Sequence, residues 1–213
     1  MRRAILAVVI VLAPQAAAAD TDARWLPWLG CWQSATERAV SPDARVCFVP
    51  SSTDLVERIA ILDPSTAPPS GQPLNADGVD HPIVDPECKG SLILEWSADG
   101  HRYYASSDRS CIDEVAARTS GISVLLPGPA WVEVEVAETS GRETVRVRRY
   151  RRVAVPASLS ERLPAELVAR ADAAANSLST MRLTVAQIVD ASSRVNSHAI
   201  EAMILESLSL IHI

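Results

Sequence analysis

Two cysteines, Cys88 and Cys111, lie equally far along the chain from the dipeptide Asp99-Gly100, and this symmetry constrains the fold more than any other feature. An Asp-Gly pair between apolar segments is a strong signal for a two-residue β-hairpin turn. The register of that turn places Cys88 directly opposite Cys111. Because paired strand residues have Cα atoms about 5.5 Å apart, or closer in non-hydrogen-bonded rows, the hairpin predicts a disulfide between them.

The other two cysteines, Cys31 and Cys47, lie on either side of the turn-forming segment 41–43, Ser-Pro-Asp, which predicts a second hairpin. Four cysteines can pair in three ways. The two hairpins favour Cys31 with Cys47 and Cys88 with Cys111. Disulfides of this kind require an oxidising compartment.

The N-terminal segment has the three parts of a secretory signal. Arg2-Arg3 is followed by an apolar run over residues 4–13 and by three alanines at 17–19, so we expect cleavage before Asp20. The apolar run is too short to span a bilayer. Residues 1–19 are therefore predicted to be a signal peptide, and the mature protein is expected in the periplasm or outside the cell without spanning a membrane.

Composition narrows the class of protein further. The net charge of -6 argues against a nucleic-acid partner. Among the 20 basic residues only Lys89 is a lysine, and alanine is abundant. This bias is typical of GC-rich bacterial coding sequences and favours the periplasm.

Residues 20–155 are predicted to form one disulfide-bonded, mainly β domain. Short segments rich in β-branched, aromatic and aliphatic residues alternate with Pro, Gly, Ser and Asp. About eight to nine strands joined by tight turns predict an antiparallel meander that closes into a barrel. One of these turns is expected at Ser120-Gly121. The expected strands lie at 28–32, 45–49, 54–62, 90–98, 101–107, 114–119, 122–126 and 130–138, with a last strand after 141.

The segment 63–87 interrupts this pattern. It is rich in Pro, Asp, Gly and Ser and lacks apolar periodicity, so it predicts a long surface loop. Its acidic side chains could supply oxygens to a calcium ion, but their spacing does not match an EF-hand. No metal site is therefore predicted.

A turn at 140–141, Ser-Gly, fixes a second register, in which Glu135 lies opposite Arg146 and Glu133 opposite Arg148. One face of this hairpin is then apolar, and the other is a ladder of opposite charges. We interpret the ladder as a solvated strand face whose ion pairs specify the register. Anion binding by the arginines is the alternative interpretation.

After residue 155 the pattern becomes helical. We expect a helix over 165–178 and two short helices at 185–194 and 197–206. Residues 156–207 are thus predicted to be a helical appendage, which is truncated because residues 208–213 match one reading frame of an adapter used in sequencing libraries. The apolar side chains of the two short helices need a covering surface, supplied by the β domain, a continuation of the chain or a partner. These side chains belong to Ile188, Val189, Ile200, Met203 and Ile204.

Gly30-x-Trp32 matches the Gly-x-Trp element on the first strand of lipocalin-like (calycin) barrels, which the chain resembles from about residue 24 to 155. In that family the tryptophan closes the barrel floor beneath an arginine from the final strand. The resemblance implies this role for Trp32, with Arg149 or Arg151 as its partner, and a small apolar ligand inside the barrel. The other candidate cavity or floor residues are Trp28, Trp96 and Tyr103.

The chain contains none of the common catalytic, phosphate-binding or zinc-binding motifs, such as Gly-x-Ser-x-Gly or His-Glu-x-x-His. We therefore predict no catalytic residue and no cofactor, and expect an exported, non-enzymatic carrier or sensor of a small apolar ligand. An interaction module that binds another envelope protein through the helical tail is the alternative. An unrecognised hydrolase is a weaker alternative.

Overall fold

The computed structural model describes residues 22–35, 44–51, 55–62, 71–83, 87–112, 115–126 and 130–177. Several predictions concern residues outside these ranges: the signal peptide at 1–19, the two short helices at 185–194 and 197–206, and the adapter-derived end at 208–213. The predicted division of the chain into domains stays a prediction for the same reason.

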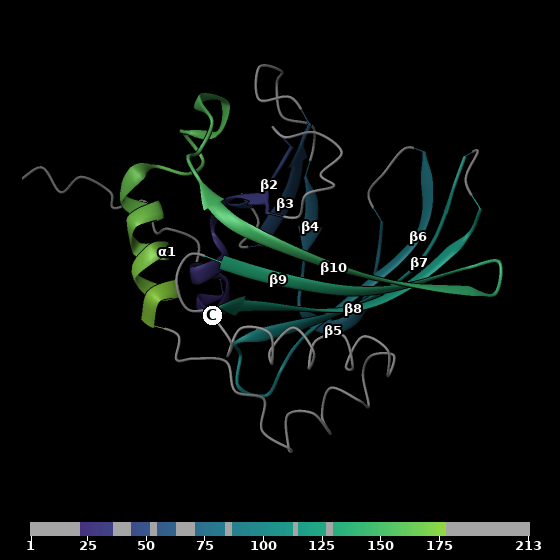
Figure 1. Ribbon diagram of the computed structural model, residues 1–213. Helices are drawn as coiled ribbons and strands as arrows, with labels where there is room; N and C mark the ends of the chain where they lie inside the picture. Colours follow the sequence, from purple (N-terminus) through teal and green to yellow (C-terminus); the bar gives the residue numbers. More distant parts are fainter. Residues whose placement is uncertain are drawn as a thin grey trace, which may run out of the picture.

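The described residues form a single antiparallel sheet of ten strands, curled into a half-barrel (Figure 1). The mainly β fold class predicted from the sequence is therefore confirmed. In sheet order the strands run β4-β3-β2-β1-β10-β9-β8-β7-β6-β5. Their bounds are β1 Gly30–Ser34, β2 Arg45–Pro50, β3 Val56–Ile61, β4 Gln72–Leu74, β5 Asp77–Pro82, β6 Cys88–Trp96, β7 Arg102–Cys111, β8 Ala117–Leu126, β9 Ala130–Thr139 and β10 Arg142–Val153.

The connectivity explains the curl of the sheet. The first strand, β1, pairs with the last, β10, so the two ends of the meander meet in the middle of the sheet. The two edge strands, β4 and β5, are joined by only Asn75 and Ala76. Because two residues span a short distance, the sheet has to bend until its edges approach each other at this point. The result is a concave inner face and a convex outer face.

Both predicted hairpin registers are confirmed. Trp96 pairs with Tyr103 across the first turn, and β9 and β10 pair as the turn at 140–141 predicts. The structure also contains both predicted disulfides, Cys31–Cys47 and Cys88–Cys111. Their Cα atoms are 4.1 Å and 3.9 Å apart, the close spacing typical of non-hydrogen-bonded pairs.

Two predictions about the strands are wrong. Ser120-Gly121 is not a turn, because both residues lie within β8 and pair with β7 on one side and β9 on the other. Gly121 serves a different purpose there: a Cβ atom at this position would approach the carbonyl oxygen of Val134 to 2.6 Å. The second wrong prediction is the loop at 63–87. This segment contains the strands β4 and β5, whose polar composition gave no strand signal.

Short helices close one end of the half-barrel. The 3₁₀ helix η1 (Ala23–Trp28) inserts Trp25 and Trp28 into the core, and the helix α1 (Ala165–Ser177) packs against η1. Between them in the chain, the 3₁₀ helix η2 (Ala157–Leu159) follows β10. Arg162 holds this segment in place by donating hydrogen bonds to the Pro50 carbonyl oxygen and the Glu57 carboxylate, both at 2.9 Å.

No helix among the described residues is both long and apolar enough to cross a membrane.

Candidate functional site

A concave cavity of about 870 Å³ lies on the inner face of the half-barrel. Pockets that hold small molecules usually have volumes of about 300 to 1,000 Å³, so the size suits a small ligand. Apolar and charged side chains both contribute to the wall. The apolar part includes Val46, Ala60, Ile83, Leu92 and Val115, and the charged part consists of Arg58, Arg109, Glu135, Arg146 and Arg148.

Below the cavity, the closed end of the half-barrel is filled by an aromatic floor. All five tryptophans of the chain belong to it, and they meet mostly edge to face or tilted. Trp131 and Tyr150 are stacked, with ring centroids 4.0 Å apart. The rings of the floor are buried and leave the cavity above them as the remaining space. Its members are Trp25, Trp28, Trp32, Phe48, Trp96, Tyr103, Trp131 and Tyr150.

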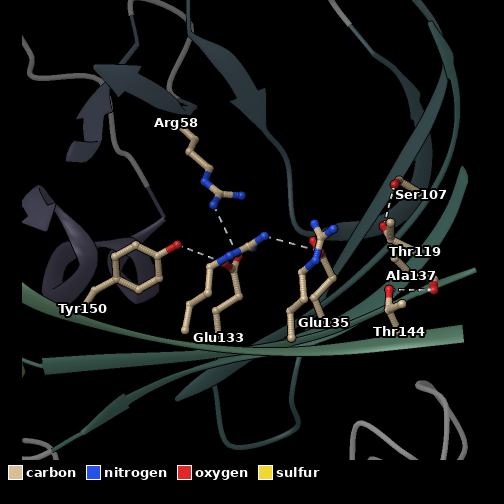
Figure 2. Close-up of polar contacts among 10 residues, drawn as sticks. Arg58, Ser107, Thr119, Glu133, Glu135, Ala137, Thr144 and Tyr150 are labelled. Carbon is tan, nitrogen blue, oxygen red and sulfur yellow. Dashed lines mark hydrogen bonds and ion pairs between the residues drawn. The ribbon is translucent and has the colours of Figure 1, made fainter. Parts of the chain in front are cut away.

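A polar cluster surrounds Glu133 on the inner face of the half-barrel (Figure 2). Two of its members, Arg58 and Arg148, line the cavity, and a third, Tyr150, belongs to the aromatic floor. The carboxylate of Glu133 accepts hydrogen bonds from Arg58 at 3.3 Å, from Arg148 at 3.1 Å and from the Tyr150 hydroxyl at 3.2 Å. Arg58 also lies 5.8 Å from the ring centroid of Trp131. Glu133 is only 8% exposed, so the three donors compensate for the loss of water around a buried carboxylate.

Glu135 continues the cluster toward the open side of the cavity. It forms ion pairs with Arg148 at 3.6 Å and with Arg146 at 3.9 Å. Among the residues that the structure describes, Arg58, Arg146 and Arg148 therefore share two carboxylates, those of Glu133 and Glu135. The cluster carries one positive charge in excess, directly at the wall of the cavity.

The protonation of these groups follows from burial and from the carboxylates. Burial is the largest single effect and lowers the pKa of Arg58, but Glu133, Tyr103, Tyr150 and Glu135 together outweigh it and raise the pKa above its ordinary value. The same balance raises the pKa of Arg148. Burial raises the pKa of Tyr150, and Glu133 raises it further. At neutral pH both arginines are thus charged, and the Tyr150 hydroxyl is a neutral donor.

The aromatic residues predicted from the sequence lie in the floor and not in the cavity wall. Trp28, Trp32, Trp96 and Tyr103 are all buried in the core cluster. Trp28 and Tyr103 are close neighbours, with ring centroids 4.9 Å apart. Burial raises the pKa of Tyr103 to about 12. None of these four side chains is among those that line the cavity.

The arginine that covers Trp32 is Arg152, and neither Arg149 nor Arg151 takes this place. The guanidinium carbon of Arg152 lies 4.3 Å from the ring centroid of Trp32, and its nitrogens donate to the carbonyl oxygens of Pro27 and Leu29. The reason is the register, because Trp32 pairs directly with Arg152. Arg151 instead is exposed and donates to the Gln33 side chain at 2.9 Å.

Sequence reasoning placed Glu133 and Arg148 on a solvated face, and this interpretation is wrong. The charge ladder faces the concave side, while the valines of β9 face outward. The alternation of strand side chains could have revealed this. Trp131 and Glu133 are two residues apart, so their side chains share one face of the strand. Because a large tryptophan belongs in the core, Glu133 should point inward as well. Tyr150 marks the inner face of β10 in the same way. Arg58 gave no comparable signal.

The chain matches no family model and no curated protein. The geometry of the cavity and the short Gly-x-Trp element are therefore the features that bear on function.

Metal ligands do not gather anywhere in the described ranges: no group of three or more His, Cys, Asp or Glu side chains is placed to hold an ion. His81 instead contacts Asp77 of the same strand at 3.0 Å. The Asp77 carboxylate also accepts hydrogen bonds from the Val79 amide and the Asn75 side chain. These contacts shape the start of β5.

Proposed function

We propose that this protein is an exported, lipocalin-like binding protein that holds a small amphipathic ligand with an anionic group in the concave cavity. The observation that carries the proposal is the wall of that cavity, which combines an apolar surface with arginines in excess of their carboxylate partners. Apolar contacts would bind the tail of the ligand, and guanidinium groups would bind its anionic head.

Three features support the lipocalin-like part of the proposal. Gly30-x-Trp32 lies on the first strand, the first strand pairs with the last, and an arginine of the last strand covers Trp32. The two disulfides agree with a periplasmic or extracellular protein. The break between β4 and β5 leaves the barrel incomplete on one side.

Calorimetric titration with two amphiphiles of equal chain length tests the proposal. Dodecanoate carries an anionic head, whereas dodecanol carries a neutral one. Dodecanoate should bind one site per chain about tenfold more tightly or better, since a hydrogen bond to a charged group contributes about 1.5 to 3 kcal/mol. Equal affinity for the two compounds would show that the arginines do not bind the anionic head group. No binding of either would contradict the proposal as a whole.

A further inference from the structure

Two hydroxyl groups meet in the wall of the cavity, apart from the cluster around Glu133. Ser107 of β7 pairs directly with Thr119 of β8, and their side-chain oxygens are 2.7 Å apart. Both residues line the cavity. Figure 2 shows Glu135 between this pair and Glu133, in agreement with the register of β8 and β9. The cavity therefore has a second polar position besides its charged side chains.

The neighbours of this hydroxyl pair within the sheet are apolar. Leu92 of β6 lies on the far side of Ser107, and Ala137 of β9 lies on the far side of Thr119. Leu92 and Ala137 also line the cavity. An apolar ligand that covers this row of side chains removes water from the two hydroxyl groups, which is unfavourable unless a new hydrogen bond replaces the water. A ligand with a polar atom at this position avoids that cost.

The hydroxyl pair has hydrogen-bonding capacity to spare. A hydroxyl group donates one hydrogen bond and accepts up to two. Where Ser107 and Thr119 bond to each other, one hydroxyl donates, and the accepting hydroxyl keeps its own proton. Among the described residues, the two side chains form no other hydrogen bond. The pair therefore offers a donor and acceptor lone pairs to a hydroxyl group of a ligand.

The distance between the hydroxyl pair and the arginines sets the size of such a ligand. Ala137 lies beside Thr119, and Glu133 lies beside Arg148. These two residues of β9 are four positions apart, which corresponds to about 14 Å along the strand. With C–C bonds of about 1.5 Å, an extended twelve-carbon chain is also about 14 Å long. An acid group at Arg148 thus places the far end of such a chain at the hydroxyl pair.

We propose that Ser107 and Thr119 form a subsite for a hydroxyl group and that the ligand is a long-chain hydroxy acid. Its carboxylate lies at the arginines, and its hydroxyl group lies near the far end of the chain. This inference rests on the proposed function, because it requires that the arginines bind the anionic group. It narrows the ligand class from anionic amphiphiles in general to those with a second, uncharged polar group.

Calorimetric titration of the mature protein with two isomers tests the proposal. 12-Hydroxydodecanoate carries its hydroxyl group at the far end of the chain, whereas 2-hydroxydodecanoate carries it beside the carboxylate. The two compounds have the same composition and the same charge. The wild type should bind the 12-hydroxy isomer about fivefold more tightly, because only this isomer can reach the arginines and the hydroxyl pair together.

Variants of the hydroxyl pair identify the source of this preference. The double variant Ser107→Ala, Thr119→Val removes both hydroxyl groups and should bind the two isomers with equal affinity. The matched control is Ser106→Ala, Ser120→Ala, because Ser106 and Ser120 are the adjacent pair on the same two strands and do not line the cavity. It should retain the preference. If the double variant does not fold, Thr119→Val is compared with Thr119→Ser, which keeps the hydroxyl group and the preference.

Two results would overturn the hydroxyl subsite and leave the proposed function intact. One is binding of both isomers to the wild type with equal affinity. The other is a preference for the 12-hydroxy isomer that persists without the hydroxyl groups of Ser107 and Thr119. If neither isomer binds and dodecanoate does not bind either, the proposed function fails, and the subsite fails with it.

Discussion

Arg58 of β3 donates a hydrogen bond to Glu133 of β9 across the concave face, with 3.3 Å between Nη2 and Oε1, although three strands separate β3 from β9 in the sheet. The contact exists only because the sheet curls. It links the two halves of the half-barrel directly above the aromatic floor. Glu133 therefore has two roles. It links β3 and β9 across the curled sheet, and it balances part of the positive charge of the arginines that line the cavity.

Replacement of Glu133 by glutamine should destabilise the fold. The change keeps the shape of the side chain but leaves Arg58 and Arg148 without their shared carboxylate. Because both guanidinium groups are about one-third exposed and partly screened by water, we expect a loss of about 1 to 3 kcal/mol in the free energy of unfolding. Urea denaturation measures it. Glu138→Gln, at an exposed position near the end of β9, is the control and should change stability by less than about 0.5 kcal/mol.

Replacement of Arg148 by alanine should weaken binding of dodecanoate about tenfold or more and leave binding of dodecanol nearly unchanged. The physical reason is the loss of a charged donor at the cavity wall. Calorimetric titration of both amphiphiles measures the effect. Arg118→Ala removes an exposed arginine outside the cavity and serves as control. If both variants weakened dodecanoate binding equally, the arginines would act only through net charge.

Stability should fall in alkaline solution, partly through Tyr103. Burial raises its pKa from 10.0 to about 12 in the folded protein. Folding therefore favours the protonated hydroxyl. The stability that this preference contributes is complete below pH 10 and is lost as the pH rises from 10 to 12. Denaturation of Tyr103→Phe over this range should show a smaller loss than the wild type, and an identical loss would contradict this assignment.

The two disulfides should differ in their sensitivity to reduction. Cys31 and Cys47 are fully buried, whereas Cys88 and Cys111 are only partly buried at the open end of the half-barrel. A mild thiol reductant should therefore reduce Cys88–Cys111 first. Alkylation followed by peptide mass spectrometry identifies the order. Loss of Cys31–Cys47 first would mean that the core opens more easily than this packing implies.

The hairpins could be predicted from the sequence because they depend on local rules. Asp99-Gly100 fixes a turn, and strand alternation then fixes the partner of every residue on both sides, including Cys88 and Cys111. The Ser120-Gly121 dipeptide is a turn signal of the same local kind, but the turn that it predicts does not form. Its glycine is required by the close approach of β9, a tertiary contact that no local pattern reveals.

The candidate site was harder to predict because it is assembled from distant strands. Trp32 lies on the first strand and its covering arginine on the last, and only the observed register selects Arg152 over its neighbours. Arg58 reaches Glu133 through the curvature of the whole sheet. Curvature depends on the closure between β1 and β10, which local sequence patterns do not specify.

Native mass spectrometry of the mature protein, expressed with export into an oxidising compartment, tests the central claim most directly. The account predicts a reproducible additional mass from a small anionic amphiphile, which is lost on denaturation and is reduced in the Arg148→Ala variant. A folded protein with both disulfides intact that carries no additional mass, and that acquires none after incubation with dodecanoate, would contradict it.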